Sequence, residues 1–167
     1  SAPQEQSDFN TAGWNSSYTG EAISPGEMQE WTDCTVARIE RLKARKIWEI
    51  GCGTGLLLLR LADTAETYFG SDFSAPALSY VAARLHRRNL AQVRLEQRLA
   101  DNFAGIEPRR LDLVVLNSII QYFPSLNYLL RVLYGAIEAV ADGGTVFLGD
   151  IRHLGLLLQF HTSVQVH

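Results

Sequence analysis

The stretch Lys46–Arg60, KIWEIGCGTGLLLLR, places three glycines between two apolar runs. A short apolar run that ends at glycines is typical of a buried strand followed by a tight turn and a helix. Gly51, Gly53 and Gly55 would let the backbone turn sharply and approach a ligand closely, because no Cβ intervenes. The stretch therefore predicts a strand–loop–helix unit whose loop either binds a ligand or closes the turn with nothing bound.

The composition is that of one globular domain. The chain has 167 residues, 47% of them hydrophobic, and a formal net charge of −3, which fits a single domain with a sizeable core. The most basic segment, Arg84–Arg88, fits the solvated face of a helix, so we expect no nucleic-acid partner. No apolar run spans a bilayer and no signal peptide opens the chain, so we expect no membrane contact. Two cysteines form no disulfide framework, and the expected location is the cytoplasm.

Strands and helices alternate along the chain. Strands are predicted at residues 47–51, 67–72, 93–96, 111–117 and 145–150. Helices are predicted at residues 24–44, 55–65, 74–89, 124–141 and 154–167. Ser24 and Glu27 form a capping signature for the first helix, and Gly143 and Gly144 are expected to stop the fourth. Apolar strands separated by helices predict an α/β fold with a parallel sheet covered on both faces.

The spacing of the glycines distinguishes three kinds of nucleotide-binding loop. A P-loop needs Lys and then Ser or Thr after the last glycine, and Leu56 and Leu57 stand there. The dinucleotide pattern G-x-G-x-x-G needs the third glycine one residue later. What remains is E-x-G-x-G-x-G at residues 49–55, which resembles motif I of the class I S-adenosylmethionine-dependent methyltransferases.

An acid at the end of the next strand is the second expectation for a nucleoside site. A carboxylate there can accept hydrogen bonds from both hydroxyls of a ribose. Asp72 lies about twenty residues beyond the loop, which is the distance expected for such a ligand. The alternative role for Asp72 is that of a turn or cap residue ahead of the following helix.

The resemblance extends to the methyltransferase domains embedded in non-ribosomal peptide synthetases. Besides the glycine loop, it rests on three segments: GWNSSYTGEAISPGEMQEW (13–31), DLVVLNSIIQYFPSLNYLLRVL (112–133) and GGTVFLGDIRHLGLL (143–157). It implies S-adenosylmethionine as cofactor, with S-adenosylhomocysteine as product, and N-methylation of an aminoacyl or peptidyl group tethered to a carrier protein. The implied partners are the adjacent adenylation and carrier domains. The alternatives are an O-, S- or C-methyltransferase acting on a carrier-bound or free molecule, and a non-catalytic scaffold that binds the cofactor.

The same resemblance implies which residues contact the cofactor. They lie in the glycine loop and after the neighbouring strands: Glu49, Gly51, Cys52, Gly53, Gly55, Asp72, Phe73, Asp101, Asn102, Asn117 and Ser118. Asp101 is implied to meet the amino group of adenine, with a turn aspartate as the alternative. Exposed amides at the start of the following helix should favour an anionic or carboxylate-bearing group. No metal is expected, because the histidines have no partners at ligand spacing.

Methyl transfer is an in-line displacement at an activated carbon, so the protein mainly has to orient its ligands and manage one proton. An exposed α-ammonium has a pKa of roughly 8, and the demand on a general base is mild. The candidate catalytic residues are Tyr18, Asn117, Asp150 and His153, and the candidate substrate-binding residues are Gln121, Tyr122 and Arg152. By resemblance, Asp150 and Arg152 face the substrate, although a surface ion pair is an open alternative. Tyr18 is implied in a lid, whereas Trp14 is expected to fill an apolar gap.

The predicted organisation is a lid segment and helix at residues 1–44, followed by a single cofactor-binding core at residues 45–167. A complete class I methyltransferase sheet has seven strands, of which the last two form an antiparallel hairpin. Here only five candidate strands precede the end of the sequence. We therefore expect a Rossmann-like core of about five mainly parallel strands without the carboxyl-terminal hairpin. The chain is then expected to be a fragment of a larger enzyme with an incomplete acceptor pocket.

Overall fold

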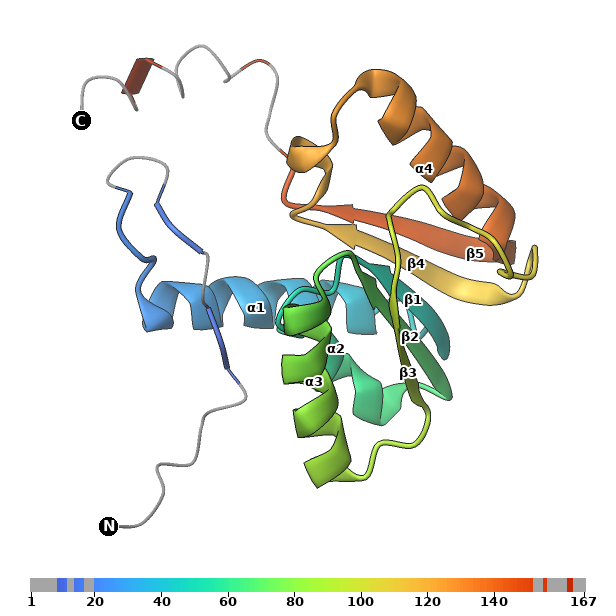
Figure 1. Cartoon of the computed structure of the whole chain (residues 1–167), viewed down its shortest axis with the longest axis horizontal. Helices are drawn as coiled ribbons and strands as arrows, with labels where there is room; N and C mark the ends of the chain where they lie inside the picture. Colours follow the sequence, from blue (N-terminus) through green and yellow to red (C-terminus); the bar gives the residue numbers. More distant parts are fainter. Residues whose placement is uncertain (1–8, 12–13, 17–19, 152–154, 156–161, 164–167) are drawn as a thin grey trace.

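The computed structural model describes residues 9–11, 14–16, 20–151, 155 and 162–163, and within them the fold is a five-stranded parallel sheet flanked by helices (Figure 1). The strands are β1 (Lys46–Ile50), β2 (Thr67–Asp72), β3 (Val93–Gln97), β4 (Leu111–Asn117) and β5 (Val140–Gly149). The helices are α1 (Pro25–Glu40), α2 (Leu58–Leu61), α3 (Ala75–Arg88) and α4 (Leu126–Ala139), with 3₁₀ turns η1 (Ala62–Thr64) and η2 (Ile120–Tyr122). This confirms the predicted α/β class and Rossmann-like sheet.

The strand order is β3-β2-β1-β4-β5, so the chain crosses from one edge of the sheet to the other side of β1 between β3 and β4. Such a reversal leaves a crevice beyond the carboxyl ends of the two central strands, which is where α/β proteins bind ligands. In this chain the two strands are β1 and β4, and the glycine loop begins directly after β1. The topology therefore positions the loop at the expected site.

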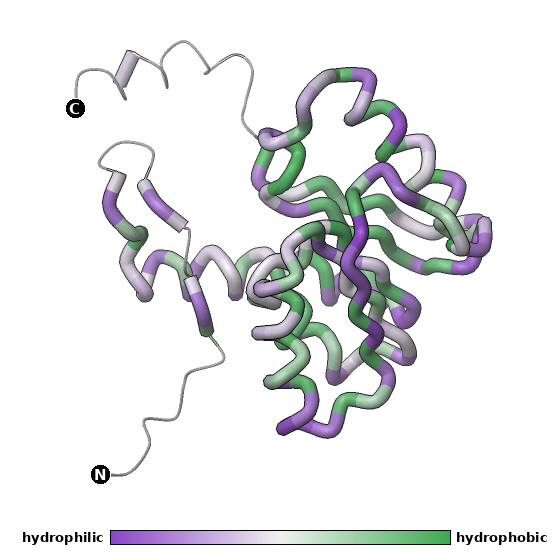
Figure 2. Tube along the Cα trace, in the orientation of Figure 1, coloured by the Kyte–Doolittle hydropathy of each residue, from purple (hydrophilic) through white to green (hydrophobic). Residues whose placement is uncertain are grey.

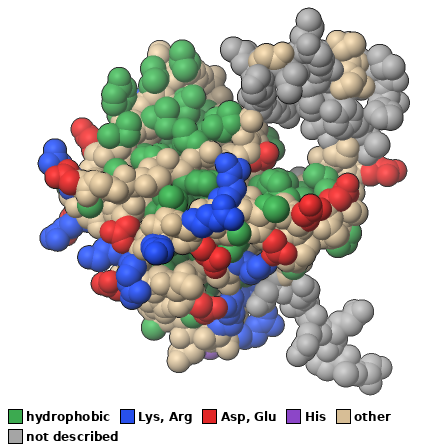
Figure 3. All heavy atoms as spheres, turned by 180° about the vertical axis from the view of Figure 1, so that it is seen from behind, with side chains coloured by type: hydrophobic (Ala, Val, Ile, Leu, Met, Phe, Trp, Pro, Cys, Tyr) green, Lys and Arg blue, Asp and Glu red, His purple; other side chains and the backbone are tan. Residues whose placement is uncertain are grey.

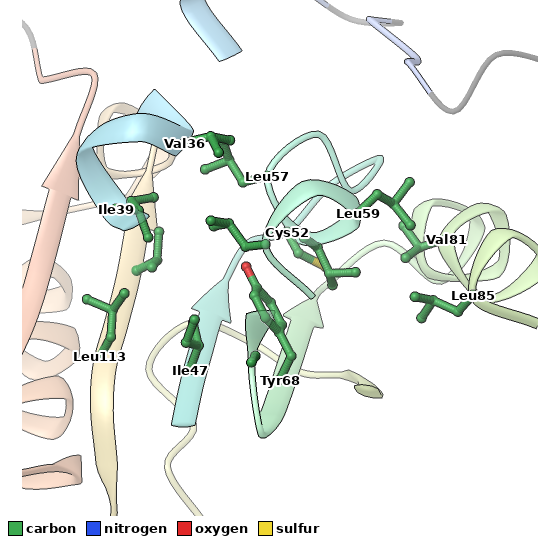
Figure 4. Close-up of a cluster of buried hydrophobic side chains, with 14 of the residues drawn as sticks. Val36, Ile39, Ile47, Cys52, Leu57, Leu59, Tyr68, Val81, Leu85 and Leu113 are labelled. Atoms are coloured by element: carbon green, nitrogen blue, oxygen red, sulfur yellow. The ribbon is translucent and has the colours of Figure 1, made fainter. Parts of the chain in front are cut away.

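Alternating side chains of the central strands fill two separate cores. On one face, Ile47 of β1 and Leu113 of β4 pack against residues of α1, α2 and α3 (Figure 4). On the other face, Trp48 and Val114 pack against α4. Figure 2 shows hydrophobic residues along the central strands, as expected when both faces of a parallel sheet are covered.

Trp48 is the largest side chain of the second core, and its exposed fraction is 0%. Its indole stacks on Phe69 at 5.3 Å between ring centroids and meets the ring of Phe103 edge-on at 5.0 Å. The indole N–H donates to the hydroxyl of Ser71 at 2.9 Å, so its polar atom is satisfied inside the sheet. Trp48 thereby ties β1 to β2 and to the segment that follows β3.

The predicted cap of α1 is confirmed, whereas the predicted end of this helix is wrong. The Glu27 amide donates to the Ser24 hydroxyl, and the Ser24 amide donates to the Glu27 carboxylate. The helix ends at Glu40 rather than near Ala44, because the chain turns through Lys43, which has a left-handed φ of 53°. The helix predicted at residues 55–65 is likewise shorter and consists of α2 followed by η1.

The predicted boundary between α4 and β5 is also wrong. We expected Gly143 and Gly144 to stop the helix, but the helix ends at Ala139 and β5 begins at Val140. The two glycines lie inside β5, opposite a register shift between Leu111 and Leu113. Gly143 has a left-handed φ of 83°, which fits a bulge in a strand better than the end of a helix. The helix predicted at residues 154–167 falls almost entirely outside the described residues.

Helix α4 exposes several large apolar side chains. They are Leu126, Leu130, Tyr134 and Ile137, which recur at helical spacing. Figure 3 shows hydrophobic side chains gathered at the upper left, over α4, whereas acidic and basic side chains are interspersed lower on that face. Among the described residues, none of the helices combines the length and hydrophobicity that crossing a bilayer requires.

Candidate functional site

A cavity of about 530 Å³ opens at the carboxyl ends of β1, β2, β4 and β5. Its polar wall contains Glu49, the glycine loop and Asp72. Its opposite wall is formed by the segment around Trp14 and by α1, while Asn117 and the residues after it complete the mouth. The cavity thus collects most of the predicted site residues that the structure describes.

The backbone amides of the glycine loop are largely occupied within the protein. The amides of Gly51 and Cys52 donate to the Ser71 carbonyl at 2.7 and 3.0 Å, and the Gly55 amide donates to the Cys52 carbonyl at 2.9 Å. The amide of Gly53 donates to Asp72 Oδ2 at 2.8 Å. The hydrogen bonds at these four positions fix the shape of the loop.

Two of the three glycines shape the cavity, and the third packs a helix. Gly51 has a φ of +74°, and a Cβ there would lie 2.6 Å from the Ile119 side chain. Gly53 has a φ of +51° and open space where its Cβ would be, so its backbone can be approached closely. Gly55 does not line the cavity; a Cβ there would meet Val81 of α3 at 3.0 Å. Gly55 thus allows close packing of loop and helix, and its predicted ligand contact stays a prediction.

Asp72 connects the loop to the start of α3. Its Oδ2 accepts from the Gly53 amide, and its Oδ1 accepts from the Ser74 amide at 2.8 Å. The side chain lines the cavity although the residue is only 6% exposed. A carboxylate offers about four lone-pair positions, so two hydrogen bonds leave acceptor capacity for a ligand. The cap role and the ligand role weighed for Asp72 are therefore compatible.

Glu49 is a buried acid beneath the loop. Its Oε2 accepts from the Tyr68 hydroxyl at 2.7 Å, and the residue is 4% exposed. Burial raises the pKa of the Glu49 carboxyl to about 8, with a further contribution from the charge of Asp72, while the Tyr68 hydroxyl opposes the shift. Burial also raises the pKa of the Cys52 thiol well above its usual value. Glu49 and Cys52 are therefore mainly neutral near pH 7 and line the cavity without adding charge.

The raised pKa of Glu49 predicts that the protein loses stability as the pH rises. Its ordinary value is 4.5, so between that value and about 8 the unfolded chain releases a proton that the native state keeps. The free energy of unfolding should fall by up to about 1.4 kcal/mol per pH unit in this window and level off above it. Glu49→Gln keeps an acceptor for Tyr68 but cannot ionise, and it should remove the slope. Urea unfolding at several pH values checks this, and an unchanged slope in the variant contradicts it.

A second group of polar side chains lies where β4 and β5 end. The Ser118 hydroxyl donates to Asp150 Oδ2 at 2.7 Å and accepts from Asn117 Nδ2 at 3.1 Å. Gln121 Nε2 donates to the Ser118 carbonyl at 2.9 Å. All four residues line the cavity, and Asn117 Oδ1 is buried without a hydrogen-bond partner among the described residues. The structure therefore brings together Asn117, Ser118, Gln121 and Asp150 as one cluster.

An adjoining cavity of about 560 Å³ shares Asp72, Phe73 and Tyr122 with the first. Phe73 is 72% exposed and Tyr122 is 80% exposed, and both lie where a ligand can cover them. Leu99 and Ala100 also line this second cavity. Sequence reasoning missed these two residues, although they follow β3 and the rule that selected the other strand ends applies to them.

Asp101 and Asn102 do not line either cavity. The Asp101 carboxylate accepts from the Arg131 guanidinium at 2.9 Å. Partial burial would raise the pKa of Asp101, but hydrogen bonds from Arg131 and Tyr128 outweigh it and hold the pKa below its usual value. Asn102 Oδ1 accepts from the Ala104 amide in a local turn. The structure thus supports the turn alternative for Asp101 and gives Asn102 a local role.

The amino-terminal segment contacts the loop and closes one side of the cavity. The Thr54 hydroxyl donates to the Asn10 carbonyl at 2.8 Å, and Asn15 pairs with Ala22 in a short antiparallel bridge. Trp14 packs against Trp31 with 4.6 Å between ring centroids, and both line the cavity. Trp14 therefore packs, as expected, but it does so in the cavity wall. The predicted site residues Tyr18, Arg152 and His153 lie outside the described residues.

Metal ligation finds no support in the described part of the chain. No group of three or more His, Cys, Asp or Glu side chains lies there in an arrangement that could hold a metal ion.

Comparison with known proteins finds relatives of this chain by sequence. A family profile described as a methyltransferase domain matches residues 48–146, which is more than half of the chain. Chondramide synthase cmdD of Chondromyces crocatus is 48% identical over 165 residues, covering 98% of this chain and 4% of that protein. The nonribosomal peptide synthetase penN of Penicillium thymicola is 39% identical over 158 residues, covering 93% of this chain and 6% of that protein. The chain thus spans a few per cent of the length of these relatives.

Solved structures share the fold at low sequence identity. The crystal structure of an S-adenosylmethionine-dependent methyltransferase from Clostridium acetobutylicum matches with a TM-score of 0.66 and 21% identity, over 79% of this chain and 53% of that one. The N-methyltransferase NodS from Bradyrhizobium japonicum matches with a TM-score of 0.67 and 17% identity, over 86% of this chain and 83% of that one. The fold and cavity define a Rossmann-like α/β protein with a cavity at its strand ends. The profile match shows that the chain belongs to the methyltransferase domain family.

Proposed function

We propose that the chain is the S-adenosylmethionine-dependent methyltransferase domain of a non-ribosomal peptide synthetase. In this proposal it methylates the amine of an aminoacyl or peptidyl group tethered to a carrier protein. One observation carries the proposal: a single cavity joins the loop anchored by Asp72 to the cluster that contains Asp150. The names of the two relatives, a synthase and a nonribosomal peptide synthetase, support the proposal that the chain is a domain of such a synthetase.

The residues present fit S-adenosylmethionine. Asp72 has acceptor capacity for ribose hydroxyls, and Gly53 leaves open space against its backbone. The second cavity is largely apolar and bordered by Phe73 and Leu99, which suits the flat face of adenine. Asn117 Oδ1 is an acceptor in the cavity wall without a partner among the described residues, and it could accept a hydrogen bond from the ammonium of the cofactor's amino-acid part. When bound, the cofactor supplies the activated methyl group.

Side chains at the mouth of the cavity are proposed to orient the acceptor amine and to accept its proton. The Asp150 carboxylate can hold an acceptor ammonium and take its proton, which leaves a neutral amine able to attack. Asn117 and Gln121 supply amide groups that can orient the amine and the acyl carbonyl. Trp14 and Trp31 form an apolar part of the cavity wall, which would limit water beside the reacting groups. Tyr18, Arg152 and His153 remain predicted contributors.

The proposed partners are the adenylation and carrier domains of the same megasynthase, in the cytoplasm. Residues 1–44 are proposed as a lid segment and helix, and residues 45–167 as the cofactor-binding core. The bond from Thr54 to Asn10 supports a lid that rests on the core, and the packing of Trp14 on Trp31 holds the lid segment against α1.

Isotope transfer tests the proposed function. The full parent synthetase module, its carrier domain loaded with an amino acid, is incubated with methyl-labelled S-adenosylmethionine, and the product is located by mass spectrometry. We expect one methyl group on the α-nitrogen, and Asp150→Asn should slow the transfer by roughly 100-fold.

Two other results of this experiment point elsewhere. A methyl group on side-chain oxygen, sulfur or carbon indicates the alternative methyltransferases. Binding of the cofactor without any transfer indicates a non-catalytic scaffold module. A module that fails to bind the cofactor at all contradicts the proposal.

A further inference from the structure

The residues directly after β4 and β5 share the same unusual backbone conformation. Asn117 and Gly149 are paired in register, so Ser118 and Asp150 are the first residues beyond the pair. Ser118 has a φ of 58° and Asp150 has a φ of 55°. Both lie in the left-handed region, which non-glycine residues rarely adopt. Two adjacent strands therefore end in the same uncommon backbone turn at the cavity mouth.

These matching turns bring the two side chains together. The Ser118 hydroxyl donates to Asp150 Oδ2 at 2.7 Å, a short hydrogen bond to a charged acceptor. Within the described residues this hydrogen bond is what holds the Asp150 carboxylate, which is exposed at the end of β5. A carboxylate on such a flexible link would otherwise sample several rotamers. The hydroxyl thus selects one orientation.

Ser118 is itself held on all its polar groups. Its amide donates to the Gly149 carbonyl at 3.2 Å, its carbonyl accepts from Gln121 Nε2, and its hydroxyl accepts from Asn117 Nδ2. The side-chain amide of Asn117 lies against Gly149, at a position where any Cβ would come within 1.9 Å of Asn117 Oδ1. Backbone strain of this kind is kept where the surroundings over-determine it, and it gathers at functional sites.

We propose that Ser118 is a positioning residue that fixes the Asp150 carboxylate toward the acceptor amine, rather than a cofactor contact. This inference rests on the proposed function and adds to it the means by which the amine is oriented. The hydroxyl keeps its own proton throughout, because an alcohol is a far weaker acid than a carboxylic acid and therefore only hydrogen-bonds to the carboxylate. The acceptor ammonium gives its proton to Asp150, the nitrogen forms a bond to the methyl carbon, and the carbon–sulfur bond breaks with its electrons going to sulfur.

A double-mutant cycle on the full chain tests this inference. Ser118→Gly removes the hydroxyl at a position whose φ glycine adopts freely, so the fold is retained. Binding is measured by calorimetry with two probes: S-adenosylhomocysteine, and then alanyl-pantetheine with an amide in place of the thioester, added to the protein saturated with S-adenosylhomocysteine. Asp142→Asn, in the first half of β5 and far from its carboxyl end, serves as the matched control.

We expect Asp150→Asn to weaken amine binding by about tenfold and Ser118→Gly by about fivefold. The double variant should bind like Asp150→Asn, because the serine acts only through the aspartate. Ser118→Asn tolerates the left-handed backbone and offers an amide donor, and it should recover part of the loss. The affinity for S-adenosylhomocysteine should stay within about twofold in all of these variants.

Three results overturn the inference. In the first, the losses of the two single variants multiply in the double variant. In the second, Ser118→Gly weakens the binding of S-adenosylhomocysteine instead of the binding of the amine probe. In the third, the unaltered chain binds S-adenosylhomocysteine but shows no affinity for the amine probe, which leaves cofactor binding standing. A chain that does not bind S-adenosylhomocysteine marks a different failure, that of the proposed function.

Discussion

Asp72→Asn is expected to weaken the binding of S-adenosylmethionine by roughly 100-fold, or about 3 kcal/mol. The wild-type carboxylate accepts from the Gly53 amide with one oxygen and from the Ser74 amide with the other. An asparagine side chain has one acceptor oxygen, so its NH₂ group would face one of these two backbone donors. The loop would lose its anchor at the same time as the ribose loses a charged acceptor.

Calorimetric titration of the purified chain with S-adenosylmethionine measures this loss. The control is Asp33→Asn on α1, which also removes one carboxylate but lies in a surface ion pair with Arg60. The affinity of this control variant for S-adenosylmethionine should stay within about twofold of the wild type, since exposed ion pairs contribute little to stability. Equal affinities for the Asp72→Asn variant and the wild type contradict the assignment of Asp72 to the ribose.

Trp48→Ala is expected to lower the free energy of unfolding by about 4 kcal/mol. The substitution leaves a cavity where a fully buried indole packed between Phe69 and Phe103. It also leaves the buried Ser71 hydroxyl without the indole N–H that donates to it. A loss of this size shifts the melting temperature of a domain of this length by about 10 °C or more.

Urea unfolding followed by circular dichroism measures the effect of Trp48→Ala. Trp31→Ala is the matched control, because Trp31 lies on α1 and is only partly buried against Trp14. We expect it to cost about 1 kcal/mol. Similar losses for the two variants would show that the second core is not centred on Trp48.

The strands and the glycine loop were predictable because short-range rules act on them alone. Apolar runs bounded by glycine or aspartate place β1, β2 and β4 within a residue of their observed bounds. The start of β5 was not predictable in this way, since Gly143 and Gly144 suit both a helix stop and a bulge. The pairing of β5 with β4 decides between them, and this contact is long-range.

The site was predictable to the extent that strand ends meet at one edge of a parallel sheet. That rule placed Asp72, Asn117 and Asp150 at one cavity. It did not place Asp101 at this cavity, since Arg131 on α4 engages that carboxylate. The left-handed turn at Ser118 leaves no signal in the sequence, since serine seldom adopts this conformation, and the one at Asp150 leaves only a weak one, since aspartate adopts it occasionally.

The positions of the tryptophans allow ligand binding to be followed by intrinsic fluorescence. The chain has three tryptophans, of which Trp48 is enclosed in the core while Trp14 and Trp31 border the ligand cavity. Emission from the paired indoles should respond when a ligand enters, and emission from the enclosed indole should change only on unfolding. With Trp48 as a constant internal reference, occupancy of the cavity becomes visible without any attached dye.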